Sequence, residues 1–206
     1  MIGVYNYTVI LTYLGLFSGF SGILYIIDGN LKMSLILLMV AGFCDMFDGK
    51  IASTKVRTKD EKRFGIQIDS LSDLVCFGVL PAVIVFRCSG GNAVHGIIPA
   101  IYLLCALIRL AWFNVDEETR QNQESGSREK YLGLPVTSAA LLLPLCIGTT
   151  SLLSLPYDQI TMWTMLIIAL AFVTPFHLRK PGNLGKLIMV LLGAVTFTLV
   201  MIGVKT

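Results

Sequence analysis

Four aspartates stand at the ends of two hydrophobic segments of this sequence, and their spacing suits joint chemistry. Asp45 and Asp48 are three residues apart, and Asp69 and Asp73 are four apart. On helices, both spacings place a pair on one face, about one turn apart. Two such helices facing each other would gather up to four carboxylates, and such a cluster needs a strong cation. Hard oxygen ligands select Mg²⁺, Mn²⁺ or Ca²⁺ rather than zinc. The alternative is that these are ordinary helix-end residues wetted by an aqueous interface.

The composition is that of an integral membrane protein. Of the 206 residues, 55% are hydrophobic and only 14% are charged, and the mean hydropathy is +0.76. Soluble domains carry about 25% charged residues. The N-terminal segment lacks a charged n-region and a small-residue cleavage site, so we expect a retained first span rather than a signal peptide. The five scattered cysteines form no CxxC pair, which argues against zinc and against a disulfide framework.

Seven hydrophobic segments are long enough to span a bilayer. They lie at about 7–27, 31–48, 66–86, 94–114, 134–154, 159–177 and 184–204. The sequence therefore predicts an all-α fold, a polytopic membrane helix bundle in one domain over residues 1–206.

The distribution of Lys and Arg predicts the orientation. Twelve of them fall in the segments 50–64, 115–133 and 178–186, against three on the other side of the membrane. By the positive-inside rule, the N-terminus and the aspartate-rich region are cytoplasmic. The aspartates then lie at the depth of the lipid headgroups. The acidic residues of 115–133 are expected in a solvated loop, namely Asp116, Glu117, Glu118, Glu124 and Glu129.

Small and basic residues surround the aspartates. Gly49, Ala52 and Gly65 would let a flat ligand or a second helix approach the backbone closely. The basic segment 50–64 could hold phosphate oxygens, or it could only set topology and touch anionic lipid. Carboxylates for a metal, small residues for a planar group and cations for phosphate together suggest a nucleotide diphosphate, and a membrane setting suggests an activated lipid.

These residues resemble the CDP-alcohol phosphatidyltransferase family. The family pattern is Asp-x-x-Asp-Gly-x-x-Ala-Arg, a spacer, then Gly-x-x-x-Asp-x-x-x-Asp. Here it reads Asp45, Asp48, Gly49, Ala52, Gly65, Asp69 and Asp73. Ser53 stands at the usual Arg position, and the spacer to Gly65 is eleven residues, slightly longer than is common. Arg57 or Lys55 would substitute for the missing charge.

Within the family, the chain is similar to compact membrane-embedded phosphatidylserine synthases of bacterial or archaeal type. The similarity rests on FGIQIDSLSDLVCFGVLPA (64–82), RLAWFN (109–114) and YLGLPVTSAALLLP (131–144). It implies a catalytic core of six transmembrane helices over about 1–155, with one or two extra C-terminal helices over about 156–206. It also implies a homodimer in the cell membrane, Mg²⁺ or Mn²⁺ as cofactor, and no nucleic-acid partner. The implied reaction transfers the phosphatidyl group of CDP-diacylglycerol to L-serine.

The resemblance also implies roles for individual residues. Asp45, Asp48 and Asp69 would hold the metal, and Asp73 would be the general base that also lies near the metal. The pocket for cytidine and diphosphate would be lined by Gly49, Ala52, Ser53, Gly65 and Arg57.

Arg109 is a charge within a predicted span. Its side chain would either snorkel to the cytoplasmic face or pair with an anion, namely the serine carboxylate or a lipid phosphate. The planar guanidinium suits either anion. Asn114 and the turn containing Tyr131, Gly133 and Pro135 are expected to complete this acceptor site. Polar residues near the N-terminus are expected mainly to start a helix and pack, namely Asn6, Thr8 and Thr12.

Two alternatives stay open. A related transferase could use glycerol 3-phosphate, inositol phosphate or another alcohol, and the lipid could be an archaeal ether analogue. Apart from Lys186 at the edge of the last span, Arg109 is the only charge within the later spans, which favours an acceptor with one anionic group. A cation transporter would instead place acids near mid-membrane beside broken helices.

Overall fold

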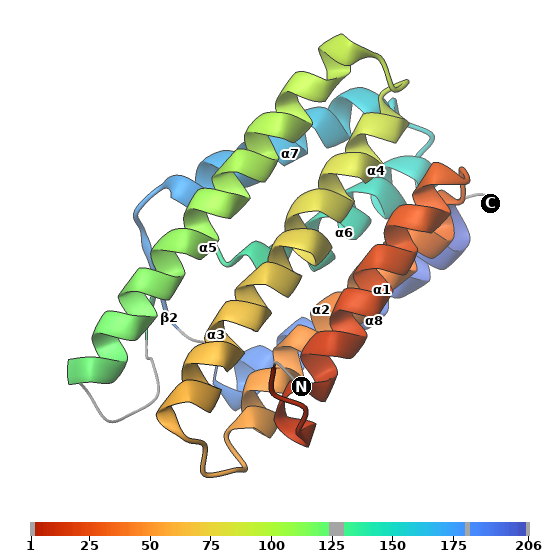
Figure 1. Ribbon diagram of the computed structural model, residues 1–206. Helices are drawn as coiled ribbons and strands as arrows, with labels where there is room; N and C mark the ends of the chain where they lie inside the picture. The colour runs from red at the N-terminus through yellow and green to blue at the C-terminus, as the bar shows by residue number, and fades with distance from the viewer. Residues whose placement is uncertain (1–2, 124–129, 180–181, 205–206) are drawn as a thin grey trace.

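The computed structural model describes residues 3–123, 130–179 and 182–204, and these form a bundle of long helices (Figure 1). α3 and α4 form one rod through the π-helical turn η2, so the described residues contain one helical rod for each of the seven expected spans. The α-helices are α1 (Ile10–Ile27), α2 (Leu31–Ala52), α3 (Lys59–Asp73), α4 (Leu80–Cys88), α5 (Ile97–Gln123), α6 (Ala139–Leu152), α7 (Tyr157–Val173) and α8 (Asn183–Gly203). The shorter turns are η1 (Tyr7–Val9), η2 (Leu74–Val79), η3 (Ala93–Gly96) and η4 (Val136–Ser138).

Several rods have the length and composition of membrane spans. The helices Tyr7–Ile27, Lys59–Cys88 and Ala93–Thr119 are long and apolar enough to cross a membrane. Shorter apolar helices cover Val136–Leu152, Tyr157–Val173 and Leu187–Gly203. Large apolar side chains face outward, with Phe17 72% exposed and Trp163 63% exposed. Such surfaces suit lipid rather than water. The chain is therefore a membrane-embedded, multi-pass protein, while the expected count of six core spans is not confirmed by these helices.

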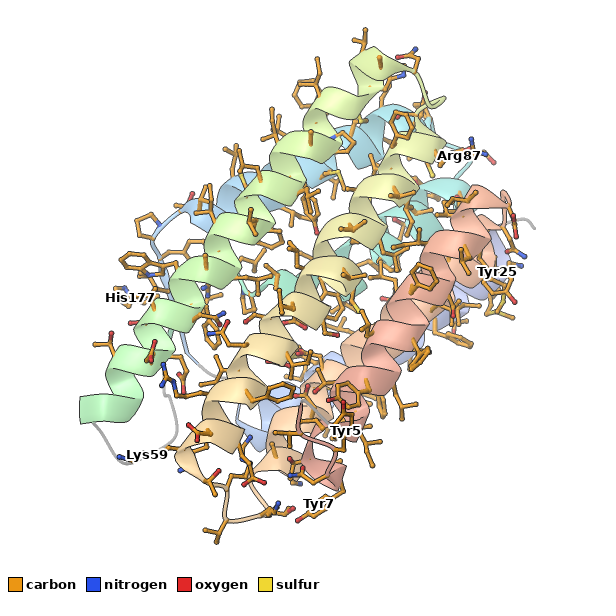
Figure 2. All side chains as sticks on the ribbon, viewed as in Figure 1. Tyr5, Tyr7, Tyr25, Lys59, Arg87 and His177 are labelled. Carbon is orange, nitrogen blue, oxygen red and sulfur yellow. The ribbon has the colours of Figure 1, made fainter. Side chains whose placement is uncertain are left out.

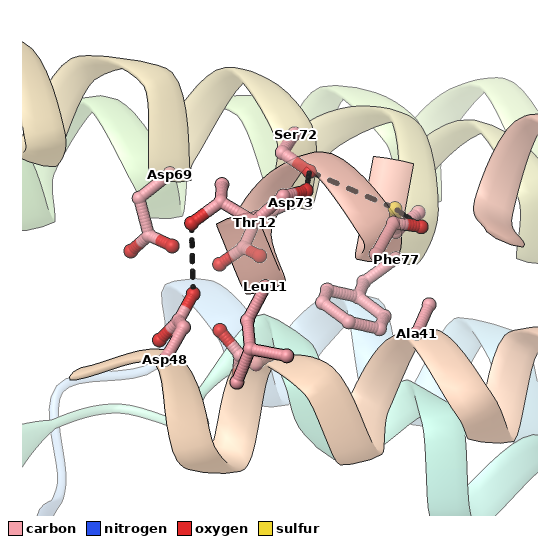
Figure 3. A pocket seen from close by; sticks show the side chains of 11 residues that line it. Leu11, Thr12, Ala41, Asp48, Asp69, Ser72, Asp73 and Phe77 are labelled. Carbon is pink, nitrogen blue, oxygen red and sulfur yellow. Dashed lines mark hydrogen bonds between the residues drawn. The ribbon is translucent and has the colours of Figure 1, made fainter. Parts of the chain in front are cut away.

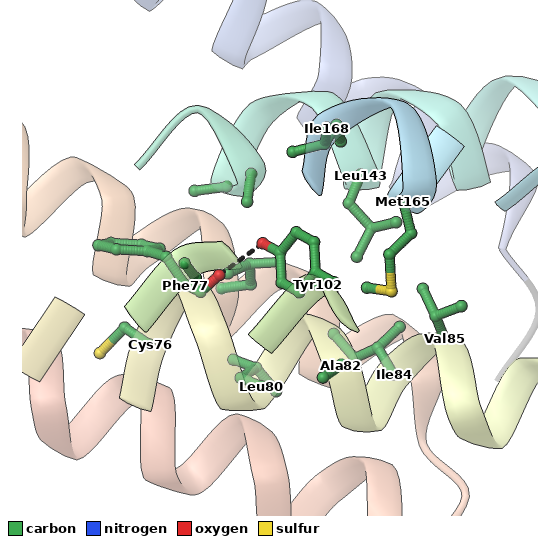
Figure 4. Packing of buried hydrophobic residues seen from close by; sticks show 14 of the residues in the cluster. Cys76, Phe77, Leu80, Ala82, Ile84, Val85, Tyr102, Leu143, Met165 and Ile168 are labelled. Carbon is green, nitrogen blue, oxygen red and sulfur yellow. Dashed lines mark hydrogen bonds between the residues drawn. The ribbon is translucent and has the colours of Figure 1, made fainter. Parts of the chain in front are cut away.

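The buried core lies where α4, α5, α6 and α7 meet (Figure 4). Phe77 of η2, Leu80 of α4, Tyr102 of α5, Leu143 of α6 and Met165 of α7 are each at most 1% exposed. Apolar contacts of this kind stabilise the bundle by dispersion and by exclusion of solvent. Because Phe77 and Leu80 belong to the rod that begins with α3, the core also fixes the helix that carries Asp69 and Asp73.

The segment 50–64 is more helical than expected. α2 continues to Ala52, and α3 already begins at Lys59. Thr58 and Glu61 form a capping box, in which the Glu61 N–H donates to Thr58 Oγ1 at 3.1 Å and the Thr58 N–H donates to Glu61 Oε2 at 2.9 Å. Hydrogen bonding at the helix terminus therefore extends α3 beyond its apolar stretch, which the span predicted from residue 66 did not include.

The prediction of a solvated loop over 115–133 is wrong for its first part. α5 continues to Gln123, so the acidic stretch 116–118 is helical. Neither Gly nor Pro interrupts this stretch, and Glu, Gln and Arg favour helix. The helix is also held to α3, because Arg63 Nη2 lies 3.3 Å from Glu118 Oε1. Two further acidic residues of the expected loop lie outside the described residues, namely Glu124 and Glu129.

Two short strands, which the sequence did not predict, join the segments after α5 and α7. β1 (Lys130–Leu132) pairs antiparallel with β2 (His177–Arg179), and Tyr131 lies opposite Leu178. α7 ends at Val173, earlier than the expected span to 177, because Pro175 disfavours the α conformation in the residue before it. The strands draw the segment that precedes α6 toward the end of α7.

The N-terminal segment and the loop after α2 lie at the same end of the bundle. Figure 2 places Tyr7 and Lys59 at one end, and Tyr25 and Arg87 at the other. Tyr7 Oη lies 3.2 Å from Thr54 Oγ1, which ties the N-terminal segment to this loop. The four aspartates lie nearer this end, between the loop and the apolar core.

Candidate active site

The four aspartates converge between α2 and α3. One carboxylate oxygen from each of Asp45, Asp48 and Asp69 lies within 4.8 Å of the other two. Asp73 lines the same pocket. Figure 3 shows Asp48 and Asp69 pointing toward one another from facing helices. The predicted convergence of the side chains is confirmed, and the individual roles of the residues stay predictions.

The carboxylates line a small pocket, which is partly open to the surroundings (Figure 3). α1 contributes Leu11, Thr12 and Gly15 to its wall, and η2 contributes Cys76 and Phe77. The wall is therefore acidic where α2 faces α3 and apolar where the rod continues toward the core. A charged ligand group would lie beside the aspartates with an apolar surface adjoining it.

Thr12 does more than the packing expected for it. Its Oγ1 donates a hydrogen bond to Asp48 Oδ2 at 3.2 Å. Its backbone carbonyl accepts a hydrogen bond from Ser72 Oγ at 3.3 Å. One residue of α1 thus contacts both helices that carry aspartates, and this restrains the orientation of the Asp48 side chain. Asn6 caps η1 and also donates from Nδ2 to Glu61 Oε1 of α3 at 3.1 Å, and Thr8 hydrogen-bonds to the Asn6 side chain.

The donor set fits a hard divalent cation. All three clustered groups offer carboxylate oxygens, the ligand type that Mg²⁺ and Mn²⁺ prefer. Two negative charges 4.8 Å apart repel by about 3 kcal/mol at an effective dielectric constant of about 20. A cation between them converts this repulsion into attraction. Asp45, Asp48 and Asp69 are therefore the residues of the described chain that are best placed to hold such an ion.

Gly49 faces open space at the edge of the cluster. A Cβ atom built at Gly49 would meet no heavy atom of the described residues within 4 Å. Helix packing therefore does not explain this glycine, and a ligand could approach the backbone closely. Ala52 lies one turn on and is partly buried. Ser53 ends the helix, where its Oγ donates to the carbonyl of Lys50 at 2.7 Å.

Arg57 reaches the opposite wall of the expected nucleotide pocket. A Cβ atom built at Gly65 would lie 3.1 Å from Arg57 Nη1, so the guanidinium lies directly over this glycine. Lys55 is directed elsewhere, because its Nζ lies 3.0 Å from Glu61 Oε1. Of the two cations expected to replace the charge missing at position 53, Arg57 is the one beside a signature residue.

Arg109 is buried and held in place at the expected acceptor site. The side chain is 6% exposed, and its Nε donates to the carbonyl of Leu134 at 3.2 Å. The guanidinium carbon lies 5.8 Å from the ring centroid of Phe113. Gly133 adjoins it with φ +77°, and a Cβ there would lie 3.1 Å from the Phe172 carbonyl oxygen and 3.6 Å from Arg109 Nε. The guanidinium is held inside the bundle by these contacts, so the alternative that Arg109 snorkels to the cytoplasmic face does not fit.

Asn114 links two helices instead of joining the turn at Gly133. Its Oδ1 accepts from Ser70 Oγ at 2.6 Å, and its Nδ2 donates to Gln67 Oε1 at 3.5 Å. These contacts place Asn114 against α3, at Ser70, the residue that directly follows Asp69. The backbone of Tyr131 lies in β1, and its side chain falls outside the described part of the structure.

Comparison with known proteins assigns the chain to a family. Residues 5–175 match the CDP-alcohol phosphatidyltransferase family. The chain belongs to this family. It is 33% identical over 135 residues to the archaetidylserine synthase of Methanothermobacter thermautotrophicus, a match that covers 65% of this chain and 54% of that protein.

Two further relatives share the name CDP-diacylglycerol–serine O-phosphatidyltransferase. The protein of Helicobacter pylori is 30% identical over 146 residues, which cover 70% of this chain and 58% of the relative. That of Saccharomyces cerevisiae is 35% identical over 144 residues, which cover 64% of this chain and 51% of the relative. The chain thus spans little more than half the length of the curated relatives it matches.

The family match extends beyond the signature on α2 and α3, to the end of α7. Within it, sequence reasoning missed Thr137 of η4, whose side chain lies beside the Asp45 carboxylate. The only sequence signal was its place in the stretch 131–144, four residues after Gly133. Tyr102 was also missed, because its hydrogen bond to the Phe77 carbonyl depends on the irregular turn η2.

Proposed function

We propose that this protein transfers the phosphatidyl group of a CDP-linked diacyl lipid to the hydroxyl of L-serine, with release of CMP. The observation that carries the proposal is the acidic pocket at the end of the bundle, where Asp45, Asp48 and Asp69 lie within 4.8 Å of one another and Asp73 lines the same wall. The names of its relatives in the family support serine as the acceptor. Because one of these relatives is named archaetidylserine synthase, the lipid substrate of this protein could be either a diacyl or an ether form.

Asp45, Asp48 and Asp69 would hold Mg²⁺ or Mn²⁺, with Asp73 close to the ion. Bound there, a divalent ion supplies charge neutralisation at a diphosphate. Thr12 hydrogen-bonds to Asp48, and such a partner keeps a ligating carboxylate in one orientation. Thr137 lies beside Asp45 and could act on it in the same way.

The CDP group would lie over the small residues at the edge of the cluster. Gly49 leaves room beside α2, and Arg57 lies over Gly65 on the facing helix. A guanidinium there would pair with phosphate oxygens through its planar fork. Ala52 and Ser53 would form the floor at the end of α2. The lipid tails would extend from this pocket along the exposed apolar faces of the rods.

In the reaction, the serine hydroxyl oxygen forms a bond to the β-phosphorus while the bond from that phosphorus to the CMP oxygen breaks. Asp73 accepts the hydroxyl proton, and CMP leaves with the electron pair of the broken bond. General-base assistance of this kind contributes about 10² to 10⁴ in rate. Arg109 would bind the serine carboxylate or the lipid phosphate, with Gly133 and Tyr131 shaping the turn beside it. Asn114, which contacts α3, would contribute to the acceptor site from that side.

The setting of the enzyme completes the proposal. The Lys and Arg distribution supports a cell-membrane protein with a cytoplasmic N-terminus and active site. We also propose that it works as a homodimer, which the family resemblance suggests. Both statements can be tested by cysteine accessibility in oriented vesicles and by cross-linking in the membrane.

The test is CMP release by the purified protein in detergent. CDP-diacylglycerol and its ether analogue are each offered with serine, glycerol 3-phosphate or inositol phosphate, in Mg²⁺, Mn²⁺ or EDTA. We expect metal-dependent CMP release with serine and formation of the serine phospholipid. Rapid release with glycerol 3-phosphate or inositol phosphate and none with serine would reassign the acceptor. No CMP release with any acceptor, although the protein remains folded, would refute the transferase proposal.

A further inference from the structure

The helical rod changes its hydrogen-bonding register directly after Asp73. η2 covers Leu74–Val79 and is a π-helix, in which the N–H of Leu80 donates to the carbonyl of Val75, five residues back. A π-turn holds more residues per turn than an α-helix, so it rotates the residues before it relative to those after it. The direction of the Asp73 side chain relative to the packed helix α4 therefore depends on η2.

The sequence contains a cause for this irregularity. In α-helical register, the carbonyl of Phe77 would accept from the N–H of residue 81. Residue 81 is proline, which has no N–H. Phe77 is 1% exposed, so water cannot readily satisfy its carbonyl. A buried carbonyl without a donor is energetically unfavourable, so a donor from elsewhere in the bundle is expected.

Tyr102 provides the missing donor from another helix. Its hydroxyl donates to the Phe77 carbonyl at 2.5 Å, as Figure 4 shows. Tyr102 is itself 1% exposed, and its ring lies 5.4 Å from that of Phe172 between centroids. α5 also packs tightly on η2, because a Cβ built at Gly78 would lie 3.1 Å from Leu103 Cδ1. The hydroxyl is thus fixed in position by close packing.

The hydrogen-bonded turn adjoins the acidic pocket. Phe77 lies one turn after Asp73, and both line the pocket with Cys76. A change in the Phe77 backbone therefore reaches the pocket wall and the Asp73 side chain through a single helical turn. Tyr102 does not line the pocket, so it would act only through the backbone of Phe77.

We propose that Tyr102 is a positioning residue: its hydroxyl holds the π-turn imposed by Pro81, and that turn directs Asp73 into the carboxylate pocket. The expected effect of Tyr102 on turnover rests on the proposed function. Its expected effect on cation binding does not, so the proposal for Tyr102 and the proposed function can fail separately.

The first test is Tyr102→Phe, which removes the hydroxyl and keeps the ring. Mn²⁺ binding to the purified protein is measured by electron paramagnetic resonance in detergent, without substrate. We expect the Mn²⁺ dissociation constant to rise about 10-fold, since partners that orient ligands typically contribute 10- to 100-fold. With CDP-diacylglycerol and serine, kcat should fall by a similar factor while KM for serine changes by less than about twofold.

The matched control is Ser18→Ala. Ser18 is also buried, and its Oγ donates to a backbone carbonyl of another helix, Leu37, at 2.8 Å, but within regular α-helices. It should lower thermal stability and leave Mn²⁺ affinity unchanged. If Tyr102→Phe also leaves Mn²⁺ affinity unchanged, or if both variants reduce it equally, Tyr102 is only a structural residue.

A second variant tests the cause of the turn. Pro81→Ala restores an N–H at position 81, so the rod can return to α-helical register. We expect weaker Mn²⁺ binding without a loss of thermal stability. Unchanged Mn²⁺ binding in Pro81→Ala would overturn the claim that Pro81 imposes the turn, just as unchanged binding in Tyr102→Phe would overturn the role of Tyr102. If the wild type releases no CMP, the proposed function fails, but the Mn²⁺ comparison still decides the role of Tyr102.

Discussion

Removal of one clustered charge is expected to change stability in opposite directions with and without a divalent cation. The perturbation is Asp48→Asn, which keeps the shape of the side chain and an oxygen that can accept from Thr12 Oγ1. Asp48 lies within 4.8 Å of both Asp45 and Asp69, so each pair repels by about 3 kcal/mol at an effective dielectric constant of about 20. Asp48 also lies close to the C-terminal end of α2, where the helix dipole disfavours negative charge.

Screening by salt and the partial exposure of Asp45 and Asp69 reduce this repulsion to about 1–2 kcal/mol. For a chain of 206 residues that corresponds to about 2–8 °C in Tm. In EDTA at pH 8, Asp48→Asn should therefore melt at a higher temperature than the wild type. In 10 mM Mg²⁺ the order should reverse, because the wild type gains the free energy of ion binding and the variant loses a ligand.

The assay is tryptophan fluorescence during heating in detergent, at both conditions. The control is Asp28→Asn, an exposed carboxylate at the far end of α1 that should respond equally in EDTA and Mg²⁺. If Asp48→Asn lowers Tm by the same amount in EDTA and in Mg²⁺, the three carboxylates do not form a cation site and the electrostatic argument is wrong.

Three further predictions concern the reaction. Asp73→Asn should reduce kcat by about 10² to 10⁴ while CDP-diacylglycerol still binds; near-wild-type turnover would contradict its role as base. Arg109→Lys should raise KM for serine with KM for CDP-diacylglycerol unchanged, because an ammonium cannot replace the planar fork; the reverse pattern would reassign Arg109 to the lipid. Gly49→Val should raise KM for CDP-diacylglycerol, measured by CMP release, at unchanged Tm, since its surroundings are open; Gly193→Val, with equally open surroundings on α8, is the control and should change neither quantity.

The sequence predicted well those features that depend on local pattern. Apolar segments of spanning length became helical rods, because burial in lipid requires internally hydrogen-bonded helices. The spacing of Asp45, Asp48, Asp69 and Asp73 predicted their convergence, because 3.6 residues per turn fixes which residues share a helix face. The ends of the rods were predicted less well, since the capping box at Thr58 and the polar end of α5 follow hydrogen bonding rather than hydropathy.

Features that depend on contacts distant in sequence were missed. β1 and β2 have three residues each, which is too short for an alternating pattern, and they pair across more than forty residues. Thr12 and Tyr102 are ordinary members of apolar helices in the sequence. Their hydrogen bonds, to Asp48 and Phe77, exist only because the bundle brings α1 against α2 and α5 against the rod containing α3.

Helix α7 contacts the expected acceptor site, although the sequence predicted a catalytic core that ends near residue 155. The N–H of Gly133 donates to the carbonyl of Phe176 at 2.7 Å, and that of Leu134 donates to the carbonyl of Ala171 at 3.1 Å. The Leu134 carbonyl in turn accepts from Arg109 Nε. The end of α7 therefore holds the turn that holds Arg109. A binding group for a small anion must be fixed to within a fraction of an ångström to discriminate between acceptors. With the role proposed for Arg109, discrimination between serine and other alcohols would depend on α7 as well as on the helices that carry the aspartates.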